Sequence, residues 1–67
     1  MIIVLTNNTE FIYVNVTNIV YFCKNNCIKS NNVYTETYIQ MIDNHSITVE
    51  ESPEEILNLI KGTCINV

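Results

Sequence analysis

The segment from Tyr38 to Glu55 constrains the fold most, because it predicts a strand, a tight turn, a second strand and the start of a helix. Ser52 is a suitable N-cap, since its hydroxyl can accept from the free backbone N–H groups of the first helical turn. Pro53 then occupies the first helical position, where its missing N–H is harmless. Glu55 lies three residues after Ser52 and completes a capping box. The sequence therefore predicts a helix that begins at Pro53.

The predicted helix continues to about Lys61 and has one apolar side. Its apolar residues follow the i, i+3, i+4 spacing of a helix that packs on a core: Ile56, Leu57, Leu59 and Ile60. Lys61 suits the negative end of the helix dipole, and Gly62 is a natural C-cap.

Short runs rich in β-branched and aromatic residues, separated by polar turns, predict strands before the helix. The expected strands are residues 1–5, 10–16, 19–24, 33–43 and 46–49. We expect a bend or one helical turn at residues 15–18, and a polar loop or long hairpin tip at residues 24–33. The sequence therefore predicts a single α+β domain over residues 1–67, with a small curved antiparallel sheet of about five strands and one C-terminal helix packed on one face.

The predicted core consists of the apolar residues on the side of each strand that faces the helix. It comprises either Ile2 or Ile3, either Val4 or Leu5, and Ile12, Val14, Ile19, Val20, Phe22, Ile39, Met41, Ile47, Val49, Ile56, Leu59 and Ile60.

Alternation along the strands places the tyrosines on the side of the sheet opposite the core. This outer side would hold Tyr13, Tyr21, Tyr38 and Gln40, joined by Tyr34 if its strand runs unbroken to Tyr38. Tyrosine is enriched at interfaces, so one interpretation is a subunit or protein interface. A second interpretation is that tyrosine simply favours strands and tolerates half-exposure. A third is that the rings stack on a base or another flat ligand.

The net charge of −4 and its distribution argue against nucleic-acid binding. The three lysines are dispersed along the chain, whereas phosphate binding needs clustered Lys or Arg. Five of the seven acidic residues lie within residues 43–55. We interpret them as a solvated face with acids near the positive end of a helix dipole, or as an acidic docking surface for a basic partner.

The cysteines do not predict a metal site. Cys23, Cys27, His45 and Cys64 are chemically acceptable zinc ligands, but their separations of 4, 18 and 19 residues lack the paired close spacing of zinc modules. We expect instead a half-buried Cys23, an exposed Cys27 on a loop, and a Cys64 that packs after the helix.

The apolar runs are short. None approaches the ~20 residues of a membrane span, and the opening run lacks the length and basic start of a signal peptide. We therefore expect a cytoplasmic protein with no membrane partner.

Catalytic chemistry is weakly indicated. His45 is the single histidine and falls in an expected turn, so a Cys27–His45 nucleophile–base pair is only formally possible. The paired carboxylates at residues 50–51 and 54–55 fall at an exposed helix start. One glycine cannot form a glycine-rich phosphate loop. The sequence predicts a protein that is not an enzyme and needs no cofactor.

The leading functional prediction is a small non-catalytic binding protein that acts as a homo-oligomer. A chain of 67 residues buries only about 60% of its unfolded surface, and self-association would add buried apolar area. Contacts would come from the tyrosine-rich side and from the 24–33 loop: Lys24, Asn25, Asn26 and Lys29. A phage or mobile-element inhibitor or accessory factor fits this size.

The alternative is a protein that sequesters a nucleotide-type ligand in an inter-subunit pocket, with Lys24, Lys29 and loop N–H groups as phosphate donors.

Short motifs at both ends resemble a known family. Four short segments are similar to small FlbD-type proteins associated with bacterial flagellar operons. They are Ile-Val-Leu-Thr at residues 3–6, Glu10-Phe11 after a turn, Asn15 followed by Ile19, and residues 49–56. The resemblance implies a small sheet with a C-terminal helix and a role as a flagellar accessory protein. The chain departs from the family pattern by lacking glycine in both turns and by its Asn-rich 24–33 segment.

Overall fold

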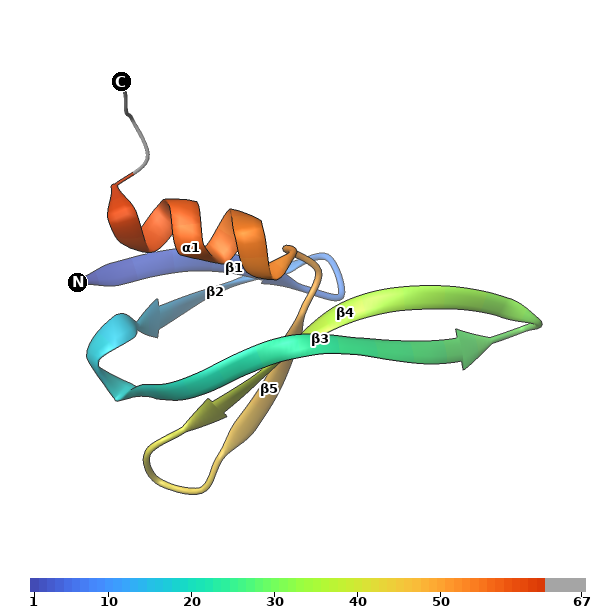
Figure 1. Cartoon of the computed structure of the whole chain (residues 1–67), viewed down its shortest axis with the longest axis horizontal. Helices are drawn as coiled ribbons and strands as arrows, with labels where there is room; N and C mark the ends of the chain where they lie inside the picture. The colour runs from blue at the N-terminus through green and yellow to red at the C-terminus, as the bar shows by residue number, and fades with distance from the viewer. Residues whose placement is uncertain (63–67) are drawn as a thin grey trace.

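The computed structural model describes residues 1–62, except for the side chain of Lys29, and confirms the α+β class (Figure 1). Its elements in chain order are β1 (Ile2–Asn7), β2 (Glu10–Asn15), the 3-10 helix η1 (Val16–Asn18), β3 (Ile19–Lys29), β4 (Asn32–Met41), β5 (Ser46–Val49) and α1 (Pro53–Lys61). Cys64 and the other residues after Gly62 lie outside the described residues.

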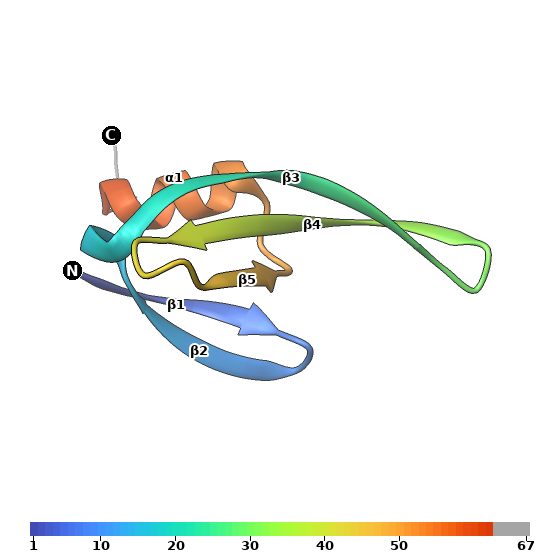
Figure 2. The same ribbon diagram turned by 90° about the horizontal axis from the view of Figure 1, so that it is seen from below.

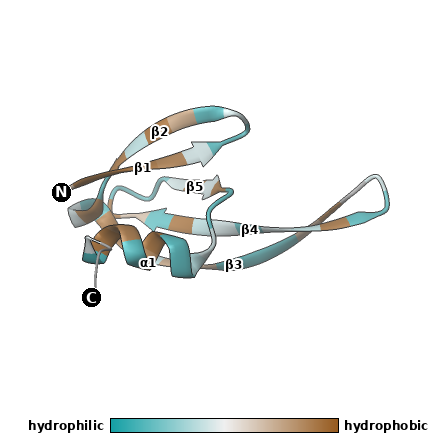
Figure 3. Cartoon of the chain, turned by 90° about the horizontal axis from the view of Figure 1, so that it is seen from above, coloured by the Kyte–Doolittle hydropathy of each residue, from teal (hydrophilic) through white to brown (hydrophobic). Residues whose placement is uncertain are grey.

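The five strands are antiparallel and form two sheets, β1–β2 and β3–β4–β5 (Figure 2). The sheets meet where β1 ends and β5 has just ended. There, the Glu50 N–H donates to the Thr6 carbonyl at 2.9 Å, and the Asn7 side-chain amide donates to the Thr48 carbonyl at 2.8 Å. The helix α1 lies over the body of the molecule and contacts β3 (Figures 1 and 3).

Both predicted ends of α1 are confirmed. The Glu55 N–H donates to the Ser52 hydroxyl at 3.1 Å, and the Ser52 N–H donates to the Glu55 carboxylate at 2.8 Å, which completes the capping box. Gly62 ends the helix in the left-handed region with φ of 82°, where an N–H can reach the last carbonyls.

The core lies between the two sheets and α1 and contains most of the predicted residues. Its buried apolar members are Ile3, Leu5, Val14, Ile39, Val49 and Ile56. The half-buried residues packed against them are Ile12, Val16, Ile19, Phe22, Met41, Ile47 and Ile60. Figure 3 shows these apolar segments in brown on both sheets and along one side of α1.

Two predicted core residues are exposed. Val20 is 58% exposed because β3 contains an irregularity between Ile19 and Tyr21, so that Val20 is an extra residue without a partner on β4. Such a bulge reverses the alternation of side chains and lets Ile19 and Phe22 both pack against the core. Leu59 is 37% exposed and lies at the margin of the apolar side of α1.

Of the two alternatives predicted for residues 24–33, the structure has the long hairpin tip and not the polar loop. β3 and β4 stay paired from Lys24↔Thr37 to Lys29↔Asn32, and only Ser30 and Asn31 form the turn. Since β5 pairs only with Thr37 to Gln40, residues 25–36 form a two-stranded arm that projects beyond the body (Figures 1 and 2). Asn25 and Asn26 are paired with Glu36 and Thr35, in a part of β4 that is rich in β-favouring Tyr and Thr. This cross-strand pairing cannot be read from the composition of residues 24–33 alone.

Two hairpins turn without glycine. Asn8 and Thr9 have φ of 54° and 74°, and Ser30 and Asn31 have φ of 51° and 65°. Positive φ at both central residues defines the type I′ turn, whose twist matches that of the flanking strands. Asparagine tolerates this conformation, but Thr9 is β-branched and is strained there.

We expect Thr9→Gly to stabilise the protein by about 1 kcal/mol. Relief of the left-handed strain, ~1–2 kcal/mol, exceeds the extra backbone entropy that glycine loses on folding, ~0.5–1 kcal/mol. The melting temperature should rise by about 4–8 °C. Thr17→Gly is the control, because Thr17 is exposed in η1 without a positive φ, and this variant should lose stability. A Thr9→Gly protein that melts no higher than wild type would contradict the assigned strain.

Candidate functional site

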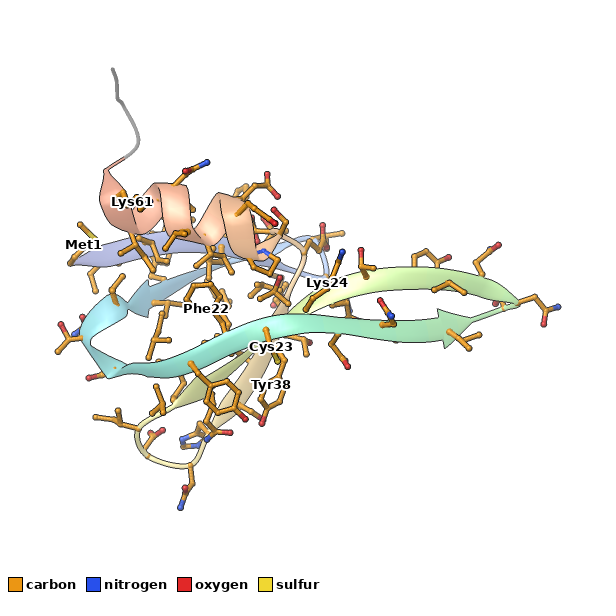
Figure 4. All side chains as sticks on the ribbon, in the orientation of Figure 1. Met1, Phe22, Cys23, Lys24, Tyr38 and Lys61 are labelled. Carbon is orange, nitrogen blue, oxygen red and sulfur yellow. The ribbon has the colours of Figure 1, made fainter. Side chains whose placement is uncertain are left out.

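A compact patch of side chains from β3 and β4 covers the side of the three-stranded sheet that faces away from α1. In the register, Tyr21 lies opposite Gln40 and Cys23 lies opposite Tyr38. Directly opposed residues of an antiparallel pair project to the same side, so these four residues form one surface, here named the tyrosine face. Figure 4 shows Phe22 on the side of β3 toward α1, with Tyr38 on the opposite side.

The side chains of the tyrosine face are held in place by one another. The rings of Tyr21 and Tyr38 have centroids 6.0 Å apart and are tilted by 37°, within the range of favourable aromatic pairs. The Tyr38 hydroxyl donates to Gln40 Oε1 at 2.8 Å. Gln40 Nε2 in turn donates to the carbonyls of Met41 and His45, each at 3.2 Å. The amide orientation of Gln40 is thereby fixed by the backbone.

The tyrosine face is accessible. Tyr21 is 50% exposed, Cys23 is exposed, and Tyr38 and Gln40 are half-buried. Desolvation raises the pKa of Tyr21 above its usual value, and the neighbouring Tyr38 and Cys23 raise it further. Tyr21 therefore presents a neutral hydroxyl at physiological pH.

The structure separates the four tyrosines that the sequence grouped on one side. Tyr13 lies on β2, in the other sheet, so its predicted place beside Tyr21 and Tyr38 is wrong. β4 is unbroken from Asn32 to Met41, as the prediction for Tyr34 required. Tyr34 shares the side of Tyr38 but lies four residues farther along, about 13 Å, on the arm.

Tyr34 lines an open hollow on the surface. This open hollow of about 530 Å³ lies between the β1–β2 turn, β4 and β5 and is lined by Asn7, Asn8, Tyr34, Glu36, Thr48, Val49 and Glu50. Two of these residues are carboxylates and none is a lysine. Cys27 Sγ donates to Glu36 Oε1 at 2.9 Å and fixes that side chain.

The residues predicted as loop contacts lie on β3. Lys24, Asn25 and Asn26 are exposed strand residues, and Lys29 is the last residue of β3. Lys24 lines a smaller hollow of about 80 Å³, together with the carboxylates Glu36, Glu50, Glu51 and Glu55. Such acidic surroundings do not favour a phosphate group near Lys24.

The cysteines and His45 are arranged differently from the prediction. Cys23 is exposed and Cys27 is half-buried, the reverse of what was expected, because both belong to β3 and Cys27 faces Glu36. Within residues 1–62, no three His, Cys, Asp or Glu side chains converge as metal ligands would. His45 Nδ1 lies 2.7 Å from Asp43 Oδ2 at the exposed β4–β5 turn. Hydrogen bonds from the His45 side chain and backbone lower the pKa of Asp43.

One polar site was not predicted. The carboxylate of Glu51 accepts from both the N–H and the hydroxyl of Thr6, each at 2.8 Å. The hydroxyl of Thr37, which is fully buried, donates to the Glu51 carbonyl. The prediction placed Glu51 on an exposed helix start, but it is half-buried and joins the two sheets.

Comparison of the chain with protein-family models, curated proteins and solved structures found no match. The FlbD-type resemblance therefore stays a prediction. Among the described helices, none has the length and apolar character needed to span a membrane.

Proposed function

We propose that this chain is a non-catalytic protein-binding domain that acts as a homo-oligomer and contacts its partner through the tyrosine face. The observation that carries the proposal is the Tyr21–Tyr38 pair, with the Tyr38 hydroxyl and the Gln40 amide fixed by hydrogen bonds. Tyrosines supply large contact areas with few rotatable bonds. Side chains already ordered before binding lose less entropy when a partner docks.

The arm would extend this contact. Asn25 lies opposite Glu36 and so projects to the side of the tyrosine face, where its exposed amide suits the polar rim that surrounds an interface core. Lys24 and Asn26 alternate to the other side of the hairpin, and Lys29 is the last residue of β3. The proposal includes a cytoplasmic location, where Cys23 would stay reduced, and a role as an inhibitor or accessory factor of a phage or mobile element.

The second candidate is a small-ligand-binding protein, which the 530 Å³ cavity supports. An aromatic ring beside two carboxylates, Tyr34 with Glu36 and Glu50, suits a cationic group. A nucleotide would place phosphates beside these carboxylates, so the lining gives little support to that ligand class. A flagellar accessory role depends on the sequence resemblance alone.

The test is affinity capture from extracts of the native host with tagged wild type, Tyr21→Ser and Leu57→Gln. Leu57 is the matched control because it is 44% exposed, comparable with Tyr21, but lies on α1, on the other side of the sheet. We expect one protein to be recovered with wild type and with Leu57→Gln. Its recovery should fall about tenfold or more with Tyr21→Ser, as for an aromatic interface hot spot.

Equal recovery with all three chains would contradict the tyrosine face as the contact surface. Recovery of a small molecule without any protein would favour the second candidate instead.

A further inference from the structure

The geometry points to the outer face and free edge of the β1–β2 sheet as the surface where a second copy of this chain binds. This inference deepens the homo-oligomer part of the proposed function by naming the surface that forms the dimer. The surface, here named the β1–β2 face, consists of Ile2, Val4, Phe11 and Tyr13.

The β1–β2 face is apolar and exposed. In the register, Ile2 lies opposite Asn15, Val4 opposite Tyr13 and Thr6 opposite Phe11, so these side chains share one side of the sheet. The alternate residues, including Ile3, Leu5 and Val14, are buried in the core. Exposed fractions on the face are Ile2 57%, Val4 44%, Phe11 71% and Tyr13 73%.

The apolar surface next to the free edge is aromatic. At about 150–250 Å² for an aromatic side chain, Phe11 and Tyr13 on β2 expose roughly 220–360 Å². Ile2 and Val4 lie on β1, one strand farther from the edge, so they adjoin the paired rings rather than form the contact.

The outer edge of β2 provides backbone contacts for a paired strand. The Val16 N–H donates to the Met1 carbonyl at 2.9 Å. This bond fixes which residues of β2 point their backbone N–H and C=O groups toward β1 and which point them to the outer edge. The backbone groups of Ile12 and Val14 therefore point to β1, and those of Phe11 and Tyr13 point to the outer edge. Among the described residues, no strand pairs with this edge.

A second copy fits this edge better than an unrelated chain because the edge is self-complementary. Two β2 strands that pair antiparallel about a two-fold axis at Ile12 place Phe11 of each copy opposite Tyr13 of the other. Only outward-pointing backbone groups are then used. The β1–β2 face has no charged member although the net charge is −4. The alternation turns Glu10 to the opposite side of the sheet, and the Glu51 carboxylate is bound by Thr6 on β1, away from the β2 edge. Two acidic chains can thus meet without opposing carboxylates.

The test uses charge exchange between copies. In one chain, Phe11 and Tyr13 are both replaced by lysine, and in a second chain both are replaced by glutamate. Sedimentation over about 5–200 µM should show wild type rising toward twice its 7.7 kDa mass, as mass action requires. Each double variant alone should stay monomeric, because like charges would meet across the axis. An equimolar mixture should form a one-to-one heterodimer.

Three outcomes would overturn the inference: wild type that stays monomeric throughout, double variants that still dimerise alone, or a mixture that stays monomeric while circular dichroism shows both variants folded. Ile28→Lys is the control, because Ile28 is equally exposed at 74% but lies on the arm, and it should leave the dimer intact. Tyr21→Ser should also stay dimeric. Loss of partner capture and loss of dimerisation can therefore be told apart, so that either proposal can fail alone.

Discussion

Replacing Ile39 with alanine is expected to leave most of the chain unfolded. Ile39 is fully buried at the centre of the three-stranded sheet, opposite Phe22 on β3 and Ile47 on β5. Truncation of such a side chain costs ~2–5 kcal/mol, because the cavity that it leaves closes only in part. Single domains are stable by roughly 5–15 kcal/mol, and a chain of this length belongs at the low end. The loss is therefore comparable with the whole stability.

Urea unfolding followed by circular dichroism measures this loss. Ile28→Ala is the matched control, because it makes the same substitution in β3 at a position that is 74% exposed. Its free energy of unfolding should stay within about 0.5 kcal/mol of wild type. Equal midpoints for the two variants would mean that the core is not centred on Ile39.

The helix could be predicted from sequence because its signals are local. Ser52, Pro53, Glu55 and Gly62 each act on backbone groups within a few residues of themselves. No knowledge of the rest of the chain is needed to place the two ends of α1. The same holds for η1, where the Asn15 side chain accepts from the Thr17 N–H two residues later, at 3.1 Å.

Strand existence was also predictable, whereas strand pairing was not. The alternation of apolar residues correctly identified Val14, Ile39 and Val49 as core residues. The bulge at Val20 depends on how β3 aligns with β4, and nothing within β3 itself indicates it. One unpaired residue is enough to reverse the side to which a side chain projects.

The candidate site was predicted in part for the same reason. Tyr21, Tyr38 and Gln40 lie on neighbouring strands of one hairpin, so alternation alone brought them together. Tyr13 is separated from them because the five strands divide into two sheets. How the two sheets are placed against each other depends on contacts distant in sequence, chiefly those of Thr6 with residues 50 and 51.

The join between the two sheets is a polar site built around Thr6. Thr6 and Phe11 are a non-hydrogen-bonded pair in the β1–β2 register, so the Thr6 backbone groups point away from β2. Its carbonyl accepts from the Glu50 N–H, and its N–H and hydroxyl donate to the Glu51 carboxylate, 45 residues along the chain. The carboxylate thus satisfies a backbone donor at a point where regular strand pairing has ended.

Glu51→Ala should lower the free energy of unfolding by about 2 kcal/mol, since a hydrogen bond to a charged group contributes ~1.5–3 kcal/mol and partial exposure of this site reduces the sum of two. Glu51→Gln keeps one acceptor oxygen and should lose about half as much. Glu50→Ala is the control, because Glu50 is exposed and contributes its backbone N–H rather than its carboxylate. It should change stability by less than about 0.5 kcal/mol.

Hydrogen exchange adds a local measurement, in which the Thr6 amide should lose protection in Glu51→Ala and keep it in Glu50→Ala. If the two alanine variants match in both stability and Thr6 exchange, the Glu51 carboxylate does not hold the sheets together, and the burial of Thr37 and Val49 alone must do so.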